Sequence, residues 1–318
     1  MPVANEPATS STPLDAILQK VLEAVPFQLT SDGGPEASRQ RFRDVPRRPV
    51  HPELRVEDHG VDGPVGPIPV RLYWPPESGD TPPPLVMFFH GGGWAVGDLD
   101  TYDGTARLHA VGAGALVVSV DYRLAPEHPF PAAVDDVWAA TQWAAAHAAD
   151  LGADPQRLAV AGDSAGGNLA AVVAHLARDA GGPPIRFQLL WYPATTWDTS
   201  LPSFTENADA PVLAGHAVGA FSRWYAGDAD LKNPPATLVP ARAADFTGLP
   251  PAYIAVAGHD PLRDDGIRYG ELLAGAGVPV EVHNATSLVH GYLGYAGVVP
   301  AATEAVDNGL VALRAALT

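Results

Sequence analysis

The segment that most constrains the fold lies near the middle of the chain. An apolar run at 158–161 ends at Gly162, Ser164 follows at a turn, and a helical pattern begins at once. This order is typical of a G-x-S-x-G nucleophile elbow, in which a buried strand turns sharply into a helix. Gly162 and Gly166 have no Cβ atoms, so the strand and the helix can approach closely while the serine hydroxyl stays exposed. The sequence therefore predicts Ser164 as a nucleophile above a helix N-terminus, where free N–H groups and a positive dipole end gather.

Short apolar runs alternate with helical patterns along most of the chain. Unbroken runs such as 85–89 favour strands that are buried on both faces, and helices between such strands favour parallel pairing. We therefore expect an α/β fold with a mostly parallel central sheet flanked by helices. The expected strands are 70–74, 85–89, 115–120, 158–161, 187–192, 252–257 and 278–282, and the expected helices are 132–147, 166–178, 266–275 and 302–316.

The N-terminal region shows a different pattern. Residues 14–25 carry apolar side chains at helical spacing, and Thr12 precedes them in the position of an N-cap. Residues 31–66 are rich in Pro, Gly, Arg and Asp without a sustained period, so we expect an irregular segment there.

An insertion interrupts the alternation between Pro193 and Leu249 and contains several aromatic residues. Active sites of α/β proteins lie at the carboxyl edge of the sheet, so we expect the insertion there, although an ordinary buried helix pair is an alternative. We assign 1–50 and 194–248 to a cap region, and 51–193 and 249–318 to the catalytic domain.

A glycine loop follows the expected strand 85–89 and reads His-Gly-Gly-Gly-Trp at residues 90–94. Its unobstructed backbone N–H groups can receive the negative charge that develops on a carbonyl oxygen during acyl transfer. A phosphate cradle is the alternative, but the G-x-x-x-x-G-K-[ST] pattern is absent. The loop is therefore a candidate oxyanion hole.

A serine nucleophile needs a base and an orienting acid, which follow it in the order Ser, Asp/Glu, His in this fold. The histidines after the elbow are His175, His216, His259, His283 and His290. We select His290, since it lies in a loop after the expected strand 278–282 and before the last helix. Asp260 follows the preceding strand, so the predicted triad is Ser164, Asp260 and His290.

Several motifs together resemble the hormone-sensitive-lipase-like family of bacterial esterases, also called family IV. They are His90 to Trp94, Asp121 to Ala133, Gly162 to Asn168, Asp260 to Gly266, and His290 to Tyr292, and the likeness spans roughly 66–318. The departures are small, with Asp265 in place of the usual Glu and Tyr292 in place of the usual Phe.

This resemblance implies an α/β-hydrolase fold with a helical cap and the same triad, acting on short-chain esters with no metal or cofactor. It implies the amides of Gly91, Gly92 and Ala165 as oxyanion donors. The expected substrate pocket comprises Trp94, Asp163, Phe221, Trp224 and Tyr292.

Charge and composition restrict the possible partners. The net charge of −17 disfavours nucleic acid and anionic lipid, and the chain has no cysteine for disulfides or thiolate chemistry. Without a signal-like start or a long apolar run, we expect a soluble cytoplasmic protein, with a homodimer suggested only by the habit of the family.

Two alternatives to an esterase stay open at this point. An amidase or carbamate hydrolase would use the same triad. A non-catalytic binding protein is also conceivable, because plant gibberellin receptors resemble this family but lack the catalytic histidine, which is present here as His290.

Overall fold

A central sheet of eight strands organises the computed structural model, which describes residues 12–76 and 81–318. Its strands are β2 (Val56–Asp62), β3 (Pro67–Tyr73), β4 (Pro84–Phe89), β5 (Leu116–Val120), β6 (Asp154–Asp163), β7 (Ile185–Trp191), β9 (Ala252–His259) and β10 (Val280–Val289). The spatial order is β10-β9-β7-β6-β4-β5-β3-β2. Only the β2–β3 and β3–β5 pairs are antiparallel, so the expected mostly parallel sheet is confirmed.

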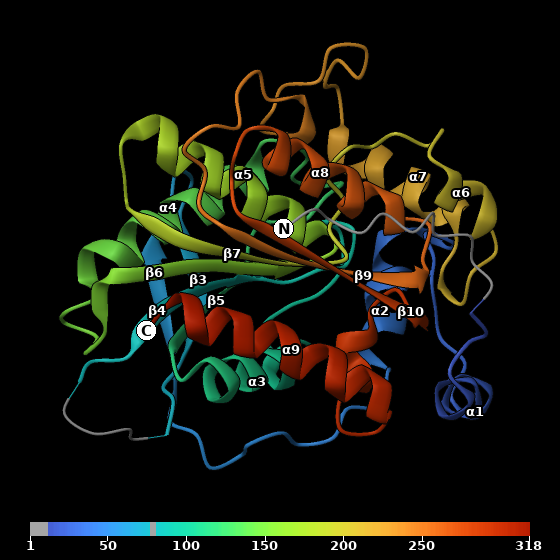
Figure 1. Ribbon diagram of the computed structural model, residues 1–318, viewed down its shortest axis with the longest axis horizontal. Coiled ribbons are helices and arrows are strands. Elements are labelled where there is room, and N and C mark those ends of the chain that lie inside the picture. The colour runs from blue at the N-terminus through green and yellow to red at the C-terminus, as the bar shows by residue number, and fades with distance from the viewer. Residues whose placement is uncertain (1–11, 77–80) are drawn as a thin grey trace.

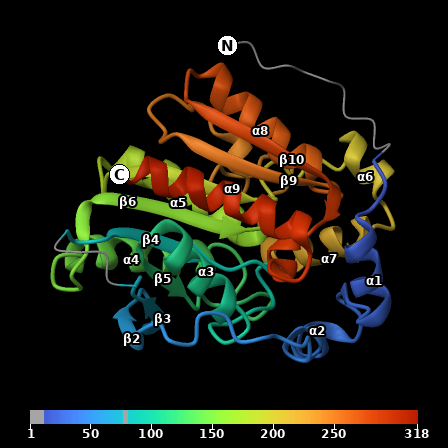
Figure 2. The ribbon, with the colours of Figure 1, turned by 60° about the horizontal axis from the view of Figure 1, so that its bottom comes forward.

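Helices cover both faces of this sheet. They are α3 (Asp103–Ala113), α4 (Ala132–His147), α5 (Ala165–Ala180), α8 (Arg263–Gly275) and α9 (Pro300–Ala316). In Figures 1 and 2, α3 and α9 lie on one face, and α4, α5 and α8 lie on the other. Consecutive residues of β4 point to opposite faces, because Phe88 belongs to the buried cluster that includes Trp191 and Leu310, whereas Phe89 belongs to the cluster that includes Val160. Both phenylalanines are fully buried, which explains the unbroken apolar run in the sequence.

The remaining elements lie outside the sheet and its flanking helices. They are α1 (Ala16–Ala24), β1 (Gln28–Leu29), α2 (Gly34–Arg43), α6 (Pro202–Glu206), β8 (Val212–Leu213) and α7 (Gly215–Ala226), with short 3₁₀ turns at Pro240–Arg242 and Tyr292–Tyr295. Of these, α1, α2, α6 and α7 gather at one end of the molecule, on the right in Figures 1 and 2. β1 pairs in parallel with β8, so backbone hydrogen bonds join the N-terminal region to the insertion. The two segments that the sequence assigns to a cap are thus one connected unit.

Two local expectations are wrong. The segment 31–66 is not irregular, since it contains α2 and β2; α2 buries only Ser38 and β2 only Val61, so neither shows an apolar period. The first helix is capped by Asp15 rather than Thr12, because the Asp15 carboxylate accepts hydrogen bonds from Ile17 N and Leu18 N.

The helix α3 was also not expected. Its buried residues are three alanines and His109, so its inner face carries little of the apolar signal on which a sequence pattern depends.

Candidate active site

Ser164 occupies the turn between β6 and α5. Its φ is 55°, a conformation that is strained for a residue with a side chain, and its amide donates to Trp191 O at 2.8 Å. A Cβ added at Gly162 would overlap the Gly166 carbonyl, and one added at Gly166 would overlap the Phe89 carbonyl. The two glycines are therefore required by the close contact of strand and helix, as the sequence predicts.

Three side chains form a continuous hydrogen-bonded chain at the carboxyl edge of the sheet. His290 Nε2 lies 2.9 Å from Ser164 Oγ, and His290 Nδ1 lies 2.7 Å from Asp260 Oδ2. The side chain of His290 is 5% exposed and that of Asp260 is 0% exposed, so the pair is shielded from water. Asp260 also accepts a hydrogen bond from Leu262 N through Oδ1, which fixes the carboxylate in its turn.

The glycine loop after β4 lies beside Ser164, but its amides are not equivalent. Gly91 N donates to Asp163 Oδ1 at 2.8 Å, so this N–H is already engaged, and the expectation that it faces an oxyanion is wrong. In the described part of the chain, the amides of Gly92, Gly93 and Ala165 donate no hydrogen bond to protein atoms. Gly93 and Ala165 also line a cavity together with Ser164.

The carboxylate of Asp163 fixes the glycine loop by accepting a hydrogen bond from it. It is almost completely buried, with Gly91 N donating to one carboxylate oxygen and Tyr102 Oη to the other, at 3.2 Å. Burial raises the pKa of Asp163 to about 7, although the Gly91 N–H, His290 and Tyr102 favour its ionised form. Asp163 therefore supports the glycine loop. It does not line the cavity, although it was expected in the substrate pocket.

The raised pKa of Asp163 predicts a change of stability with pH. Between the ordinary value of 3.8 and about 7, the folded chain keeps a proton that the unfolded chain releases, so this carboxyl makes the free energy of unfolding fall as pH rises. Asp163→Asn cannot titrate but can still accept from Gly91 N. We expect denaturant unfolding at about pH 5 and about pH 8 to show the variant gaining stability relative to the natural protein at the higher pH. A pH-independent difference would contradict this assignment.

A cavity of about 250 Å³ opens above Ser164 and Ala165. Its walls come from the N-terminal region and from the insertion, with Leu29 of β1, Leu213 of β8 and Phe221 of α7 among them. Most of the lining side chains are apolar, so the cavity suits an uncharged group of a substrate.

Aromatic side chains from the loop and the insertion form part of the cavity wall. Trp94 lines the cavity and stacks on Tyr225 at 4.3 Å between ring centroids, nearly parallel. Phe221 and Trp197 also line it, whereas Trp224 packs edge-on against Phe221 and is not part of the lining.

The expected pocket residue Tyr292 also lies outside the cavity lining. It is fully buried and packs against Trp191 and Tyr192, in the layer beneath the triad. The structure thus brings Trp94 and Phe221 of the expected pocket into the cavity, and not Asp163, Trp224 or Tyr292.

Several residues of the site were not expected from the sequence. The ring of Tyr192 contacts His290, with 4.6 Å between ring centroids, and Asn207 of the insertion donates to Asp260 O at 3.2 Å. Tyr192 directly follows the buried strand β7, and this position at a carboxyl strand end was the available signal. Asn207 had no such signal, because its neighbours in sequence are outside any motif.

Asp265 supports the wall of the same cavity. Its Oδ1 accepts from Thr195 N, Thr196 N and Thr195 Oγ at 2.5 to 2.8 Å, and burial raises its pKa to about 6. The aspartate that replaces the usual glutamate of the family therefore fixes the chain where the insertion begins.

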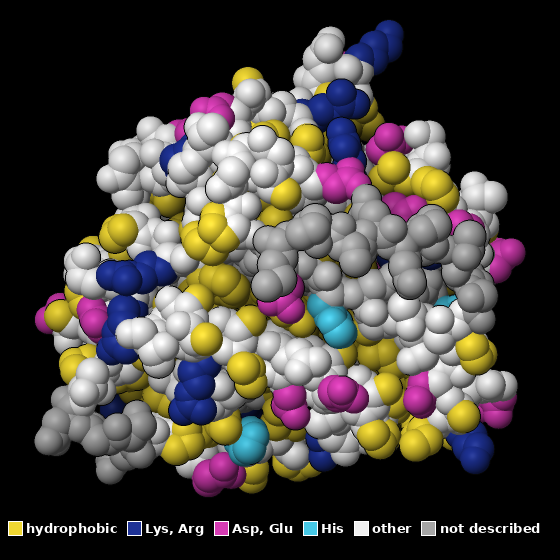
Figure 3. Space-filling view, viewed as in Figure 1, with side chains coloured by type: hydrophobic (Ala, Val, Ile, Leu, Met, Phe, Trp, Pro, Cys, Tyr) yellow, Lys and Arg dark blue, Asp and Glu magenta, His cyan; other side chains and the backbone are white. Residues whose placement is uncertain are grey.

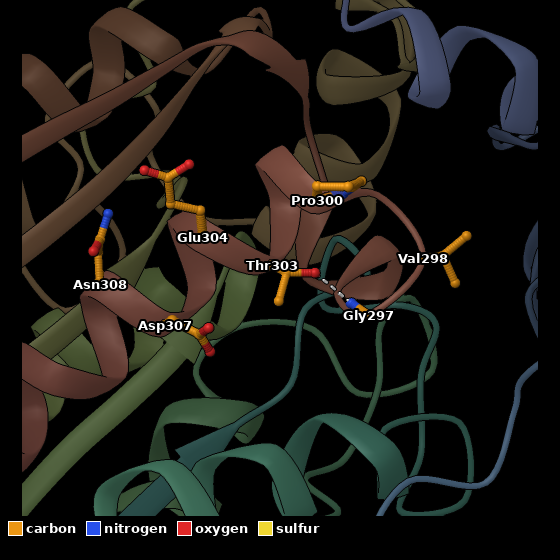
Figure 4. A pocket seen from close by; sticks show the side chains of 7 residues that line it. All are labelled: Gly297, Val298, Pro300, Thr303, Glu304, Asp307 and Asn308. Carbon is orange, nitrogen blue, oxygen red and sulfur yellow. Dashed lines mark hydrogen bonds between the residues drawn. The ribbon is translucent and has the colours of Figure 1, made fainter.

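A second hollow, of about 430 Å³, lies on the surface at the start of α9 (Figure 4). It is lined only by residues between Gly297 and Asn308, and the carboxylates of Glu304 and Asp307 point away from each other. It contains no nucleophile and base in contact, so it does not compete with the cavity above Ser164 as a candidate active site.

Neither a metal centre nor a membrane span is found in the residues that the structure describes. Within 12–76 and 81–318, no three His, Asp or Glu side chains gather as metal ligands, and no helix is long and apolar enough to cross a membrane. On the face shown in Figure 3, acidic side chains are spread out rather than gathered in one patch.

Comparisons with known proteins agree with the fold and with the serine–histidine–aspartate geometry of the site. Residues 86–294 match the family model described as alpha/beta hydrolase fold. The esterase LipI of Mycobacterium tuberculosis is 68% identical over 100% of this chain and 99% of its own length. The carboxylesterase NlhH of the same species is 55% identical over 98% of this chain and 99% of its own length.

Solved structures are also similar to this chain over almost its whole length. The crystal structure of DphMB1 has 75% sequence identity and a TM-score of 0.93, covering 96% of this chain and 99% of that one. A thermostable esterase from Pseudomonas putida has 34% identity and a TM-score of 0.90, covering 98% and 99%. The chain therefore belongs to the α/β-hydrolase family, in its hormone-sensitive-lipase-like branch of esterases.

Proposed function

We propose that this protein hydrolyses carboxylic esters through an acyl-enzyme formed on Ser164. The observation that carries the proposal is the hydrogen-bonded chain from Ser164 Oγ through His290 to Asp260, at the foot of an apolar cavity. A serine hydroxyl is a weak nucleophile alone, and an adjacent imidazole that an acid holds in place is what activates it. The relatives named esterase and carboxylesterase, which align over nearly the whole chain, support the same activity.

In the proposed reaction, His290 Nε2 takes the proton of Ser164 Oγ as the hydroxyl attacks the ester carbonyl. Asp260 accepts the Nδ1 hydrogen and stabilises the imidazolium that forms. The imidazolium then protonates the leaving alcohol as the ester C–O bond breaks. Water attacks the acyl-enzyme with His290 again as the base, and the imidazolium returns this proton to Ser164 Oγ as the acyl–Oγ bond breaks and the carboxylic acid leaves. No further group is needed to balance these steps.

We assign stabilisation of the oxyanion to the amides of Gly92, Gly93 and Ala165. These three donors make no hydrogen bond to protein atoms among the described residues, and Gly93 and Ala165 line the cavity beside Ser164. Donors that are already in place and shielded from water stabilise developing charge strongly; loss of one such donor typically lowers kcat about a hundredfold to a thousandfold.

The cavity supports esters with a short apolar group as substrates. Its volume of about 250 Å³ and its wall of Leu29, Leu213 and Phe221 leave limited room for an acyl or alcohol group. The segments 1–50 and 194–248 provide these walls, so we propose that together they form the cap that sets the size limit.

The test is the rate of hydrolysis of a series of 4-nitrophenyl esters of increasing acyl length, run beside a 4-nitroanilide and a carbamate. We expect kcat/KM to be highest for short acyl groups and far lower for the anilide, because the cavity limits chain length and an amine is a poorer leaving group. Turnover of the anilide or carbamate in preference to every ester would reject ester hydrolysis as the main activity.

A further inference from the structure

Arg39 reaches from the N-terminal part of the cap to the chain around the glycine loop. Its Nε donates to Ala95 O at 2.9 Å, and its Nη2 donates to Ala125 O at 3.0 Å. The guanidinium also forms a two-pronged pair with Glu127, at 3.1 and 2.5 Å. The side chain is only 15% exposed, whereas that of Arg43 on the same helix is 46% exposed.

The two carbonyls that Arg39 contacts depend on it. Ala95 and Ala125 are both fully buried, and in the described part of the chain neither carbonyl accepts a hydrogen bond from another protein donor. A buried backbone carbonyl without a donor is costly, so these two bonds hold the segments in place. The pair with Glu127 contributes less, since the Glu127 side chain is 51% exposed and is screened by water.

The two residues that carry these carbonyls are also bonded to the glycine loop through their amides. Ala95 N donates to Gly92 O at 3.1 Å, and Ala125 N donates to Trp94 O at 2.9 Å. Arg39 therefore connects the turn 92–95 to the loop segment around Ala125, which is itself bonded to that turn. Among the described residues, no other side chain of the N-terminal region donates a hydrogen bond to this turn.

The turn itself needs support from outside. Gly92, Gly93 and Trp94 have φ values of 105°, 61° and 57°, and the last is a strained value for a bulky side chain. Such conformations persist only where surrounding contacts fix them. The cap supplies contacts from two directions, because Phe221 of α7 packs so closely on Gly93 that a Cβ there would lie 2.7 Å from its ring.

We propose that Arg39 is a positioning residue for the oxyanion amides, so that the cap takes part in stabilising the transition state and does more than cover the substrate. This inference rests on the proposed roles of Gly92 and Gly93. Arg39 acts through the carbonyls of Ala95 and Ala125 and does not touch the substrate, since it is not among the residues that line the cavity.

The decisive variant is Arg39→Ala. We expect kcat to fall roughly tenfold to a hundredfold while KM changes less than about threefold, because a small displacement of preorganised donors weakens binding of the transition state more than of the substrate. The inhibition constant of a trifluoromethyl ketone, which forms a tetrahedral adduct with the serine, should rise in proportion to the loss of kcat/KM. An increase in KM with kcat unchanged would overturn the proposal and leave Arg39 as a cap anchor only.

Two control variants separate positioning from general effects. Arg43→Ala removes a half-exposed arginine of the same helix, which pairs only with Glu36 and Asp98, and kcat should stay within about twofold. Glu127→Gln removes the carboxylate but leaves both carbonyl bonds of Arg39, and it should also stay within about threefold. A loss with Glu127→Gln as large as with Arg39→Ala would show that the ion pair, not the carbonyl bonds, matters, and would overturn the proposal.

A further pair of measurements keeps the test valid if the alanine variant folds poorly. Arg39→Lys keeps the charge but cannot reach both carbonyls, so it should show the same loss of kcat on a folded protein. Added guanidinium, well below concentrations that unfold the chain, should restore kcat of Arg39→Ala and not alter that of Arg43→Ala. Full activity of Arg39→Lys would reject the proposal. Absence of ester turnover by the natural protein would instead reject the proposed function itself.

Discussion

Replacing Ser164 by alanine is expected to abolish turnover while leaving the cavity able to bind substrate. The nucleophile and its base act as a unit, and removal of either from such a triad typically lowers kcat on the order of a million-fold. Alanine fits the turn at least as well as serine in size, and the bond from residue 164 N to Trp191 O does not involve the side chain. The measurement is kcat on a 4-nitrophenyl ester, with substrate binding followed separately by tryptophan fluorescence, since Trp94 and Trp197 line the cavity.

Ser200→Ala is the matched control for this variant. Ser200 is exposed, and among the described residues its side chain bonds only to Asp198, so its removal should leave kcat within about twofold. Retention of a tenth of the natural activity by Ser164→Ala would reject Ser164 as the nucleophile.

Replacing His290 by alanine is expected to have an effect of the same size. His290 is the only residue whose side chain bonds to Ser164 Oγ among those described, so its loss leaves the hydroxyl without a base. Asp260→Asn should also be severely impaired, by about ten-thousand-fold in the best-studied triad, because the amide would hold the imidazole in the wrong tautomer. The readout is kcat/KM for a short ester in each variant.

Two other histidines of the same region provide the controls. His259 Nε2 lies 3.1 Å from Thr12 O in the N-terminal region, and His283 of β10 stacks on Tyr253 of β9. Neither contacts Ser164, so His259→Ala and His283→Ala should retain most of the activity. If His283→Ala were the inactive variant, the proposed base would have to be replaced.

The central strands of the sheet could be predicted from the sequence because they are buried on both faces. Strand 85–89 has no polar residue, and the helix expected at 132–147 begins and ends where α4 does. The nucleophile elbow at Ser164 could also be predicted, because strand, glycine, serine and helix follow one another without interruption.

The elements that the sequence did not indicate are those with little apolar contact. α2 carries three arginines and a glutamate and fully buries only Ser38. Its position depends on polar bonds such as those of Arg39 as well as on the packing of Phe42 against Tyr102. The periodicity of apolar residues reveals which side chains are buried. It gives no information about hydrogen bonds between residues far apart in the sequence, such as those of Arg39.

The correct donors of the glycine loop could not be chosen from the sequence for a related reason. From the sequence alone, the amides of the three consecutive glycines are equivalent candidates for oxyanion donors. Only the structure shows that the carboxylate of Asp163 already accepts from Gly91 N, which leaves Gly92 and Gly93. The turn that sets these directions depends on left-handed backbone conformations, which the residue types permit without specifying their order.

The pairing of β1 with β8 has a consequence for how the protein is made. Gln28 and Leu29 leave the ribosome long before Val212 and Leu213, their partners in the two-stranded ribbon. Asp15 N likewise bonds to Ser287 O, near the other end of the chain. Contacts so distant in sequence form late in folding, so residues 28–29 cannot dock until residues 212–213 have been synthesised, and the cavity above Ser164 is completed only after that.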